Sequence, residues 1–161
     1  MLTLNSLDSK GFLTRSNFDI NRVIKDTAAT FEGTCNAKDI VLDLTFAADI
    51  QMVYADLGKI QQVLYNLIDN AIKFSRENSV IYIQTSLKYE KVFISVKDTG
   101  IGIPAEQQEN IFKPFTEVKD LTTGDGLGLP ICSLIAAKMN GSLTLDIGYT
   151  KGTRFILELH V

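Results

Sequence analysis

Two asparagines and a lysine share one face of a predicted helix, and they are the first residues that could do chemistry. Asn66, Asn70 and Lys73 occupy positions i, i+4 and i+7, which at about 100° per residue places them within about 60° of arc. An asparagine amide oxygen can ligate a hard cation such as Mg²⁺, and a lysine one turn on would reach phosphate oxygens. Because Lys59 and Gln62 extend the same stripe, a solvated helix face is the simpler interpretation of this helix taken alone.

A carboxylate followed by two glycines is the second such feature. Asp98 ends a predicted strand and precedes Gly100 and Gly102. Glycines let the backbone approach a ligand closely, and a carboxylate can accept a hydrogen bond from the amino group of adenine. A tight turn capped by the aspartate is the alternative, and this segment alone does not decide between the two.

A glycine-rich loop just before a predicted helix is the third feature. Residues 124–130 read GDGLGLP, and the free N–H groups and the dipole of a helix N-terminus favour an anion. Pro130 fits the first helical turn, because its missing N–H would be unpaired there anyway. The loop lacks the Gly-Lys-Ser/Thr ending of a Walker A motif and follows no simple strand, so the dinucleotide fingerprint does not fit either.

Apolar spacing predicts the elements that must position these residues. A long helix from Asp56, its N-cap, to about Ser75 carries the two asparagines, because apolar residues from Ile60 onward recur at helical spacing. The other predicted elements are an extended segment over 12–20, a helix from 19 or 21 to about 36, a strand over 40–46, a hairpin of strands 79–87 and 92–98, a helix over 129–139, and strands over 142–147 and 153–159. Together they predict an α/β (α+β) two-layer sandwich, a mixed β-sheet covered on one face by about three helices.

Composition limits the kind of protein this is. Of the 161 residues, 45% are hydrophobic and 22% are charged, which are globular proportions. The formal net charge is −3, whereas a nucleic-acid binder needs a basic surface. The apolar runs are far shorter than the roughly 20 residues of a membrane span. Cys35 and Cys132 lie far apart in predicted helices, so we expect two buried free thiols.

Taken in order, these segments resemble the histidine-kinase branch of the GHKL ATPase superfamily, whose ATP-binding domain has the Bergerat fold. Residues 62–75, QVLYNLIDNAIKFS, resemble the N box of that family, and residues 98–104 resemble its G1 box. Residues 111–115 resemble its F box and 124–131 its G2 box, while Gly152 and Thr153 match the pair that begins its last core strand. The resemblance makes residues 12–161 the ATP-binding catalytic domain, and residues 1–11 resemble the end of a preceding dimerisation and phosphoacceptor helix with its linker.

The resemblance implies a site for ATP and Mg²⁺. Asn66 and Lys73 would take catalytic roles, and Asn70 would ligate the metal. Asp98 would accept a hydrogen bond from the adenine amino group with support from Thr153, and residues 116–125 would form a mobile lid. The implied nucleotide-binding residues are Asn66, Asn70, Lys73, Phe74, Asp98, Gly100, Gly102, Ile103, Phe112, Lys119, Gly124, Gly126, Leu127, Gly128, Leu129 and Thr153.

Asn66 separates this chain from the hydrolytic branches of the superfamily. In the gyrase and MutL branches a glutamate that activates water stands at this position, and an amide cannot take that proton. The resemblance therefore implies slow ATP hydrolysis and transfer of the γ-phosphoryl group to a histidine. Three residues depart from the family pattern: Asp125 replaces the usual Thr or Ser, Lys113 replaces an acidic residue of the F box, and the lid holds Lys119 but no arginine. These departures leave the role of the lid open.

His160 is the only histidine of the chain, and it lacks the acidic neighbour of a phosphoacceptor site, so we expect it at the surface. The resemblance implies that the phosphorylated histidine lies on a dimerisation domain absent from this chain, and that a response regulator receives the phosphoryl group from it. We expect a monomeric, cytoplasmic domain that contacts neither nucleic acid nor membrane, and whether the parent protein is membrane-anchored stays open.

Two other functions stay open on the sequence. An anti-sigma-type serine kinase of the same superfamily is disfavoured by Asn66 and by the histidine-kinase-like F box. A degenerate module that holds a partner without binding nucleotide is disfavoured by the intact Asn70, Lys73 and Asp98, while Asp125 lends it some support.

Overall fold

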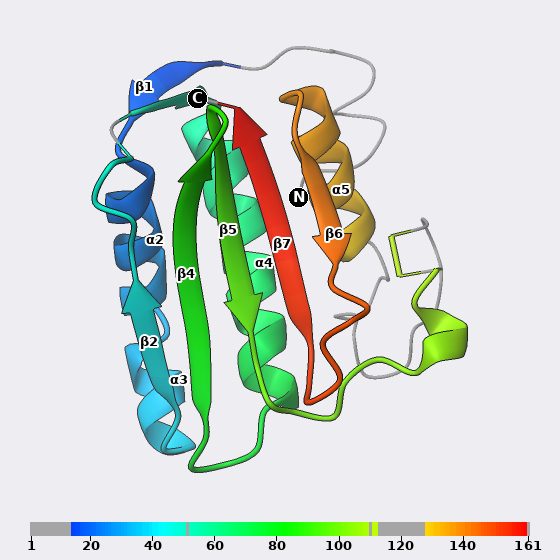
Figure 1. The fold of residues 1–161 in the computed structure, drawn as a ribbon. Helices are drawn as coiled ribbons and strands as arrows, with labels where there is room; N and C mark the ends of the chain where they lie inside the picture. Colours follow the sequence, from blue (N-terminus) through cyan, green and yellow to red (C-terminus); the bar gives the residue numbers. More distant parts are fainter. Residues whose placement is uncertain (1–13, 51, 110, 113–127, 161) are drawn as a thin grey trace.

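Five strands form one mixed β-sheet in the computed structural model, which describes residues 14–50, 52–109, 111–112 and 128–160. In spatial order the strands are β2 (Val41–Thr45), β4 (Val80–Lys88), β5 (Lys91–Lys97), β7 (Arg154–His160) and β6 (Ser142–Leu145). β2 runs parallel to β4, and the other neighbouring strands are antiparallel. The sheet is therefore mixed, as the sequence predicts (Figure 1).

The helices of the described chain lie on one face of this sheet (Figure 1). They are α2 (Ile20–Ala29) and α3 (Glu32–Ala37) near the β2 edge, α4 (Leu57–Phe74) behind the middle strands, and α5 (Gly128–Lys138) behind β6. The remaining elements are a short antiparallel pair, β1 (Ser16–Phe18) with β3 (Val53–Ala55), and a 3-10 turn, η1 (Ala105–Gln107). The predicted two-layer sandwich is confirmed. Within the described ranges, no helix combines the length and the apolar character needed to cross a membrane.

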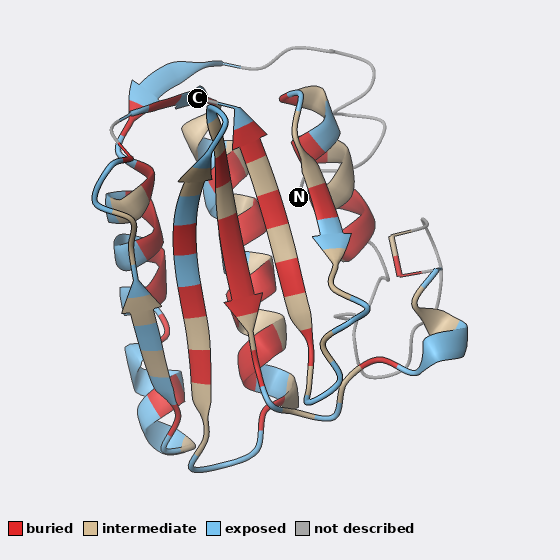
Figure 2. Ribbon diagram, viewed as in Figure 1, coloured by how far each residue is buried: buried red, intermediate tan, exposed pale blue. Residues whose placement is uncertain are grey.

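Alternation along the strands turns one face of the sheet toward the helices. On β7, Phe155, Leu157 and Leu159 are buried while the residues between them keep some exposure. Leu157 lies opposite Ile94 of β5, which is also fully buried, and Figure 2 shows the same alternation along β4. Because successive side chains of a strand point to opposite faces, this pattern decides which face the helices cover.

Both ends of α4 are held by side chains. The Oδ1 of Asp56 accepts a hydrogen bond from the Lys59 N–H at 3.2 Å, which caps the N-terminus. At the other end, the Nζ of Lys38 donates to the carbonyl oxygens of Ile72 at 2.9 Å and Ser75 at 3.2 Å, where a cation also complements the helix dipole. The buried face between these ends comprises Ile60, Val63, Leu64, Leu67, Ile68, Ala71 and Ile72.

Two parts of the chain differ from the sequence-based expectation. The single helix expected up to residue 36 is two helices, which meet at Thr30 and Phe31. The Thr30 hydroxyl donates to the Thr27 carbonyl at 2.7 Å, a local bond that competes with a continuing helix, and the Phe31 ring packs on Tyr65 with centroids 4.7 Å apart. The sequence does not predict β3, because three residues that pair with a distant strand carry little periodic signal.

Replacing Asp56 with alanine should lower the free energy of unfolding by about 1 kcal/mol, because the Lys59 N–H loses its cap. The Thr14 N–H also donates to Oδ2 of Asp56 at 3.0 Å, so the same change releases the backbone before β1. Asp56→Asn keeps a capping oxygen and should lose only a small part of that stability. Urea denaturation followed by circular dichroism measures both variants, and equal losses would contradict the capping role.

Candidate functional site

A small pocket lies where the C-terminal half of α4 faces the ends of β5 and β7. Its lining residues come from α4, from the two strands and from the adjoining loops: Leu67, Asn70, Ala71, Phe74, Val96, Asp98, Gly102, Thr153 and Phe155. The open volume is about 10 Å³, roughly the room that one water molecule needs. A purine ring is much larger than this open volume.

Asp98 brings a charge into this lining, directly after β5, and is only 5% exposed. Its Oδ1 accepts hydrogen bonds from the N–H of Gly100 at 2.9 Å and of Thr153 at 3.2 Å. Burial raises the pKa of the Asp98 carboxyl above its ordinary value, and the two backbone hydrogen bonds oppose that rise. Among the residues that the structure describes, no donor contacts Oδ2.

The main chain of Asp98 is held by the connection between β6 and β7. Its N–H donates to the Thr153 carbonyl at 2.9 Å, and its carbonyl oxygen accepts from the Tyr149 hydroxyl at 2.8 Å. Thr153 thus meets Asp98 through both of its own main-chain groups. A carboxylate at the end of one strand is therefore positioned by residues more than fifty places later in the chain.

Two glycines after β5 allow the path that the backbone takes here. A Cβ added at Gly100 would overlap the carbonyl oxygen of Phe74, at the last residue of α4. Gly102 has φ +73°, a region that residues with side chains rarely adopt. The Asp98-to-Gly102 segment can therefore form this wall of the pocket only with glycine at both places.

The polar stripe of α4 leads away from the pocket. Asn70 lines the pocket itself. The Nζ of Lys73 lies 2.9 Å from Oδ2 of Asp69, one turn earlier, and the Lys73 side chain is 43% exposed. Such an exposed i, i+4 ion pair is weak, so the lysine can exchange this carboxylate for another anion at little cost.

Asn66 lies further along the stripe, against α5. Its Nδ2 donates to Sγ of Cys132 at 3.6 Å, and its Oδ1 is 4.0 Å from the place where a Cβ on Gly128 would lie. The amide oxygen is therefore close to the N-terminus of α5, where free N–H groups favour anions. Burial raises the pKa of the Cys132 thiol to about 12, so the thiol stays protonated at neutral pH. Cys35 and Cys132 are both buried and free, as predicted.

Most of the other predicted residues that the structure describes are apolar and lie in or near the core. Phe74 lines the pocket, Ile103 is 9% exposed, and the Phe112 ring packs edge-on against Phe155 with centroids 6.1 Å apart. Gly128 begins α5 and Leu129 is buried behind it. The predicted residues that lie outside the described residues are Lys119, Gly124, Gly126 and Leu127, together with the expected lid over 116–125, the departures at Lys113 and Asp125, and the expected helix remnant over 1–11.

Three residues that contact the predicted set were not anticipated. Asp69 pairs with Lys73, Cys132 accepts from Asn66, and Tyr149 donates to Asp98. Asp69 could have been found from its i, i+4 spacing to Lys73. Cys132 and Tyr149 carry no such signal, because their partners are 66 and 51 positions away in sequence.

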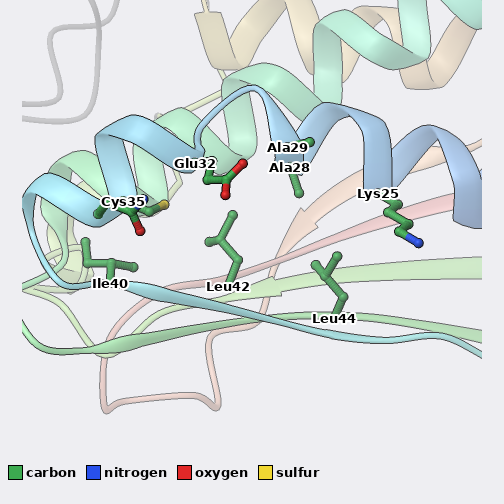
Figure 3. Close-up of a pocket in the computed structure, with 9 residues that line it drawn as sticks. Lys25, Ala28, Ala29, Glu32, Cys35, Ile40, Leu42 and Leu44 are labelled. Atoms are coloured by element: carbon green, nitrogen blue, oxygen red, sulfur yellow. The ribbon is translucent and has the colours of Figure 1, made fainter.

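A wider hollow of about 310 Å³ lies elsewhere, between α2, α3 and β2. Figure 3 shows Leu42 and Leu44 of β2 facing the helix residues Ala28 and Ala29 across it. Burial raises the pKa of the Cys35 thiol in its lining, so the thiolate that would be the nucleophile is scarce. The hollow is a mostly apolar gap at the sheet edge, and the predicted residues do not line it.

Comparison with protein families agrees with this geometry. The family model described as histidine kinase-, DNA gyrase B-, and HSP90-like ATPase matches residues 55–161. A curated relative is the alginate biosynthesis sensor protein KinB of Pseudomonas aeruginosa, 34% identical over 125 residues that cover 78% of this chain and 21% of KinB. The chain therefore spans about a fifth of the length of that relative.

Solved structures share the same arrangement of sheet and helices. The catalytic domain of the histidine kinase ThkA superposes with a TM-score of 0.83 at 34% identity, covering 92% of this chain and 96% of that one. ThkA in complex with the response regulator protein TrrA gives a TM-score of 0.77 at 32% identity, with coverage of 91% and 41%. Full-length ShkA in complex with AMPPNP gives 0.81 at 29% identity, with coverage of 92% and 31%.

Gly100→Ala should lower the free energy of unfolding by about 1–3 kcal/mol, because the new methyl group would overlap the Phe74 carbonyl oxygen and force the loop away from α4. Gly33→Ala is the matched control: it lies within α3 with no atom near an added Cβ, and it should stabilise by about 0.5–1 kcal/mol. Urea denaturation of both variants measures the difference. A neutral Gly100→Ala would show that the loop does not need this close approach.

Asp98→Asn should raise the free energy of unfolding at pH 7, because a neutral amide keeps an accepting oxygen without the desolvation of a buried charge. Since the folded pKa of Asp98 is raised, its contribution to stability is greatest below the ordinary value of 3.8 and is lost as the pH rises through the folded pKa. The advantage of asparagine should therefore be largest at neutral pH and should close below that ordinary value. Urea unfolding at several pH values tests this, and a variant less stable than wild type at pH 7 would contradict it.

Proposed function

The chain belongs to the histidine kinase-, DNA gyrase B-, and HSP90-like ATPase family, and on that premise we propose that it binds ATP with Mg²⁺ and donates the γ-phosphoryl group to a histidine of a phosphoacceptor domain. That domain would precede this one, with residues 1–11 as the remnant of its last helix, and a response regulator would then receive the phosphoryl group. ThkA, with which the chain superposes, has been solved with such a regulator. The proposal places this domain in the cytoplasm, where ATP and response regulators are found.

The observation that carries the proposal is the buried carboxylate of Asp98. Its Oδ1 accepts from the backbone N–H groups of Gly100 and Thr153, and no donor from the described part of the chain reaches Oδ2, which would accept from the ligand. The adenine ring offers an amino group as the donor, and Phe74, Val96 and Phe155 line the same pocket with apolar surface for the ring. A carboxylate with one free oxygen in an apolar pocket is a poor site for an anion but a good one for a neutral base that donates.

The polar stripe of α4 and the N-terminus of α5 would receive the phosphates. The residues there suit Mg²⁺, which keeps several waters and takes one or two protein oxygens beside those of the phosphates. Asn70 offers an amide oxygen for that purpose, Asn66 lies near the N-terminus of α5, and Lys73 has a partly exposed side chain one turn beyond Asn70. When bound, Mg²⁺ would neutralise charge on the β- and γ-phosphate oxygens.

The proposed reaction is an in-line transfer in which the chain mainly positions and neutralises. A histidine ring nitrogen of the phosphoacceptor domain attacks the γ-phosphorus, the bond from that phosphorus to the β–γ bridging oxygen breaks, and ADP leaves. Asn66 cannot take a proton from water, so the bound ATP is spared hydrolysis until the histidine arrives. Once the Lys73 ammonium has left its ion pair with Asp69, it would balance the negative charge of the transferred phosphoryl group.

Titration calorimetry with ADP and a slowly hydrolysed ATP analogue, with and without Mg²⁺, tests this proposal. We expect Kd values near the micromolar range that fall when Mg²⁺ is present. Asn70→Ala should remove the Mg²⁺ dependence, because it removes an oxygen ligand, whereas the exposed Gln61→Ala on the same helix should leave it intact. An intact domain that binds neither nucleotide would instead be a degenerate module.

Radiolabelled ATP together with a phosphoacceptor domain supplied in trans completes the test. Label on the histidine, recognised by its acid lability, supports a histidine kinase. Acid-stable label on a serine would favour the anti-sigma type of kinase instead.

A further inference from the structure

The structure assigns a role to Tyr149, which lies outside every segment that resembles the family motifs. We propose that Tyr149 is a positioning residue: it holds the peptide of Asp98 so that the free carboxylate oxygen selects a base with an exocyclic amino group. The proposal rests on the proposed nucleotide site, and it adds a determinant of base selectivity in the connection between β6 and β7.

The contact is short and directed at the main chain. The Tyr149 hydroxyl donates to the carbonyl oxygen of Asp98 at 2.8 Å, while the Asp98 N–H donates to Thr153 at 2.9 Å. The β6–β7 connection therefore forms hydrogen bonds with the peptide groups on both sides of the Asp98 α-carbon. With these groups held, the carboxylate has little freedom beyond rotation about its own side-chain bonds, which the Gly100 and Thr153 N–H groups restrict.

The connection that carries Tyr149 is itself braced. The N–H of Tyr149 donates to the carbonyl of Asp146 at 3.2 Å, and the Asp146 carboxylate accepts from Nη1 of Arg154 at 2.9 Å. The same guanidinium donates through Nε to the Ser95 hydroxyl of β5 at 2.8 Å. These contacts connect the loop to β5, the strand that directly precedes Asp98, and they fix the position from which the Tyr149 hydroxyl donates.

The face of the Tyr149 ring also contacts a cation. The Lys97 ammonium, one residue before Asp98, lies 5.7 Å from the Tyr149 ring centroid and 4.9 Å from that of Tyr82, distances at which a cation is attracted to an aromatic face. Burial raises the pKa of the Tyr149 phenol, and Asp98 and Tyr82 add to the rise. The hydroxyl therefore keeps its proton, and remains a donor, at neutral pH.

Tyr149→Phe removes this one hydroxyl and keeps an aromatic ring beneath the Lys97 ammonium. In calorimetric titrations we expect the affinity for ADP to fall about three- to tenfold. A displaced Asp98 carboxylate would lose its hydrogen bond to the adenine amino group, and a loss of this size corresponds to one hydrogen bond. Affinity for inosine diphosphate, which carries an oxo group in place of the adenine amino group, should stay within about twofold. Equal losses for both nucleotides, or no loss for ADP, would overturn the proposal. Tyr54→Phe, at an exposed tyrosine, is the matched control and should change neither affinity.

Amide hydrogen exchange of the nucleotide-free domain tests the same role without any ligand. Gly100 donates to the Asp98 carboxylate, so its amide should exchange several-fold faster in Tyr149→Phe, while the amide of the buried Ile94 in β5 should not change. Unchanged exchange at Gly100 would overturn the positioning role. If wild type binds no ADP but the exchange changes as expected, the proposed function fails and the positioning of Asp98 stands.

Discussion

The fold buries the carboxylate of Asp98 almost completely, directly after the end of β5. Burial raises its pKa, and the two backbone N–H groups on Oδ1 offset only part of the cost. Much of the surrounding structure follows from this placement. The loop after it must pass against the end of α4, which requires glycine at position 100, and the β6–β7 connection must fold back over its peptide. Burial therefore disfavours the ionised form of this carboxyl in the free domain.

α4 joins this carboxylate to the rest of the proposed site. The helix buries one face in the core and presents Asn66, Asn70 and Lys73 on another. Most of the stability of a helix in a protein comes from the packing of its apolar face, and Asp56 and Lys38 satisfy free backbone groups at the two ends of α4. Lys38 donates to two carbonyl oxygens of the last turn, and the Phe74 carbonyl of the same turn is the group that a Cβ at Gly100 would overlap.

The base end and the phosphate end of the proposed site are held by different kinds of contact. At the base end, main-chain hydrogen bonds near 3 Å fix Asp98, an arrangement suited to discrimination between bases. At the phosphate end, Lys73 rests in an exposed ion pair and Asn66 makes a long contact with a thiol. Such contacts are weak, so these side chains can turn toward a charged ligand at low cost. The pocket at the base end has an open volume of only about 10 Å³.

The sequence by itself determined the sandwich and the long helix with its polar stripe, because these depend on periodicity. It also singled out Asp98 and its glycines as candidates from residue types at short spacing. It also placed the ends of most strands within a few residues. The break between α2 and α3 escaped it, because a local threonine bond and the packing of Phe31 on Tyr65 outweigh helix propensity there. Only the tertiary structure decided which residues meet Asp98, Asn66 and Lys38 across 34 to 66 positions of chain. Contacts of that separation depend on how the sheet and helices close on one another, and a linear pattern carries no record of that closure.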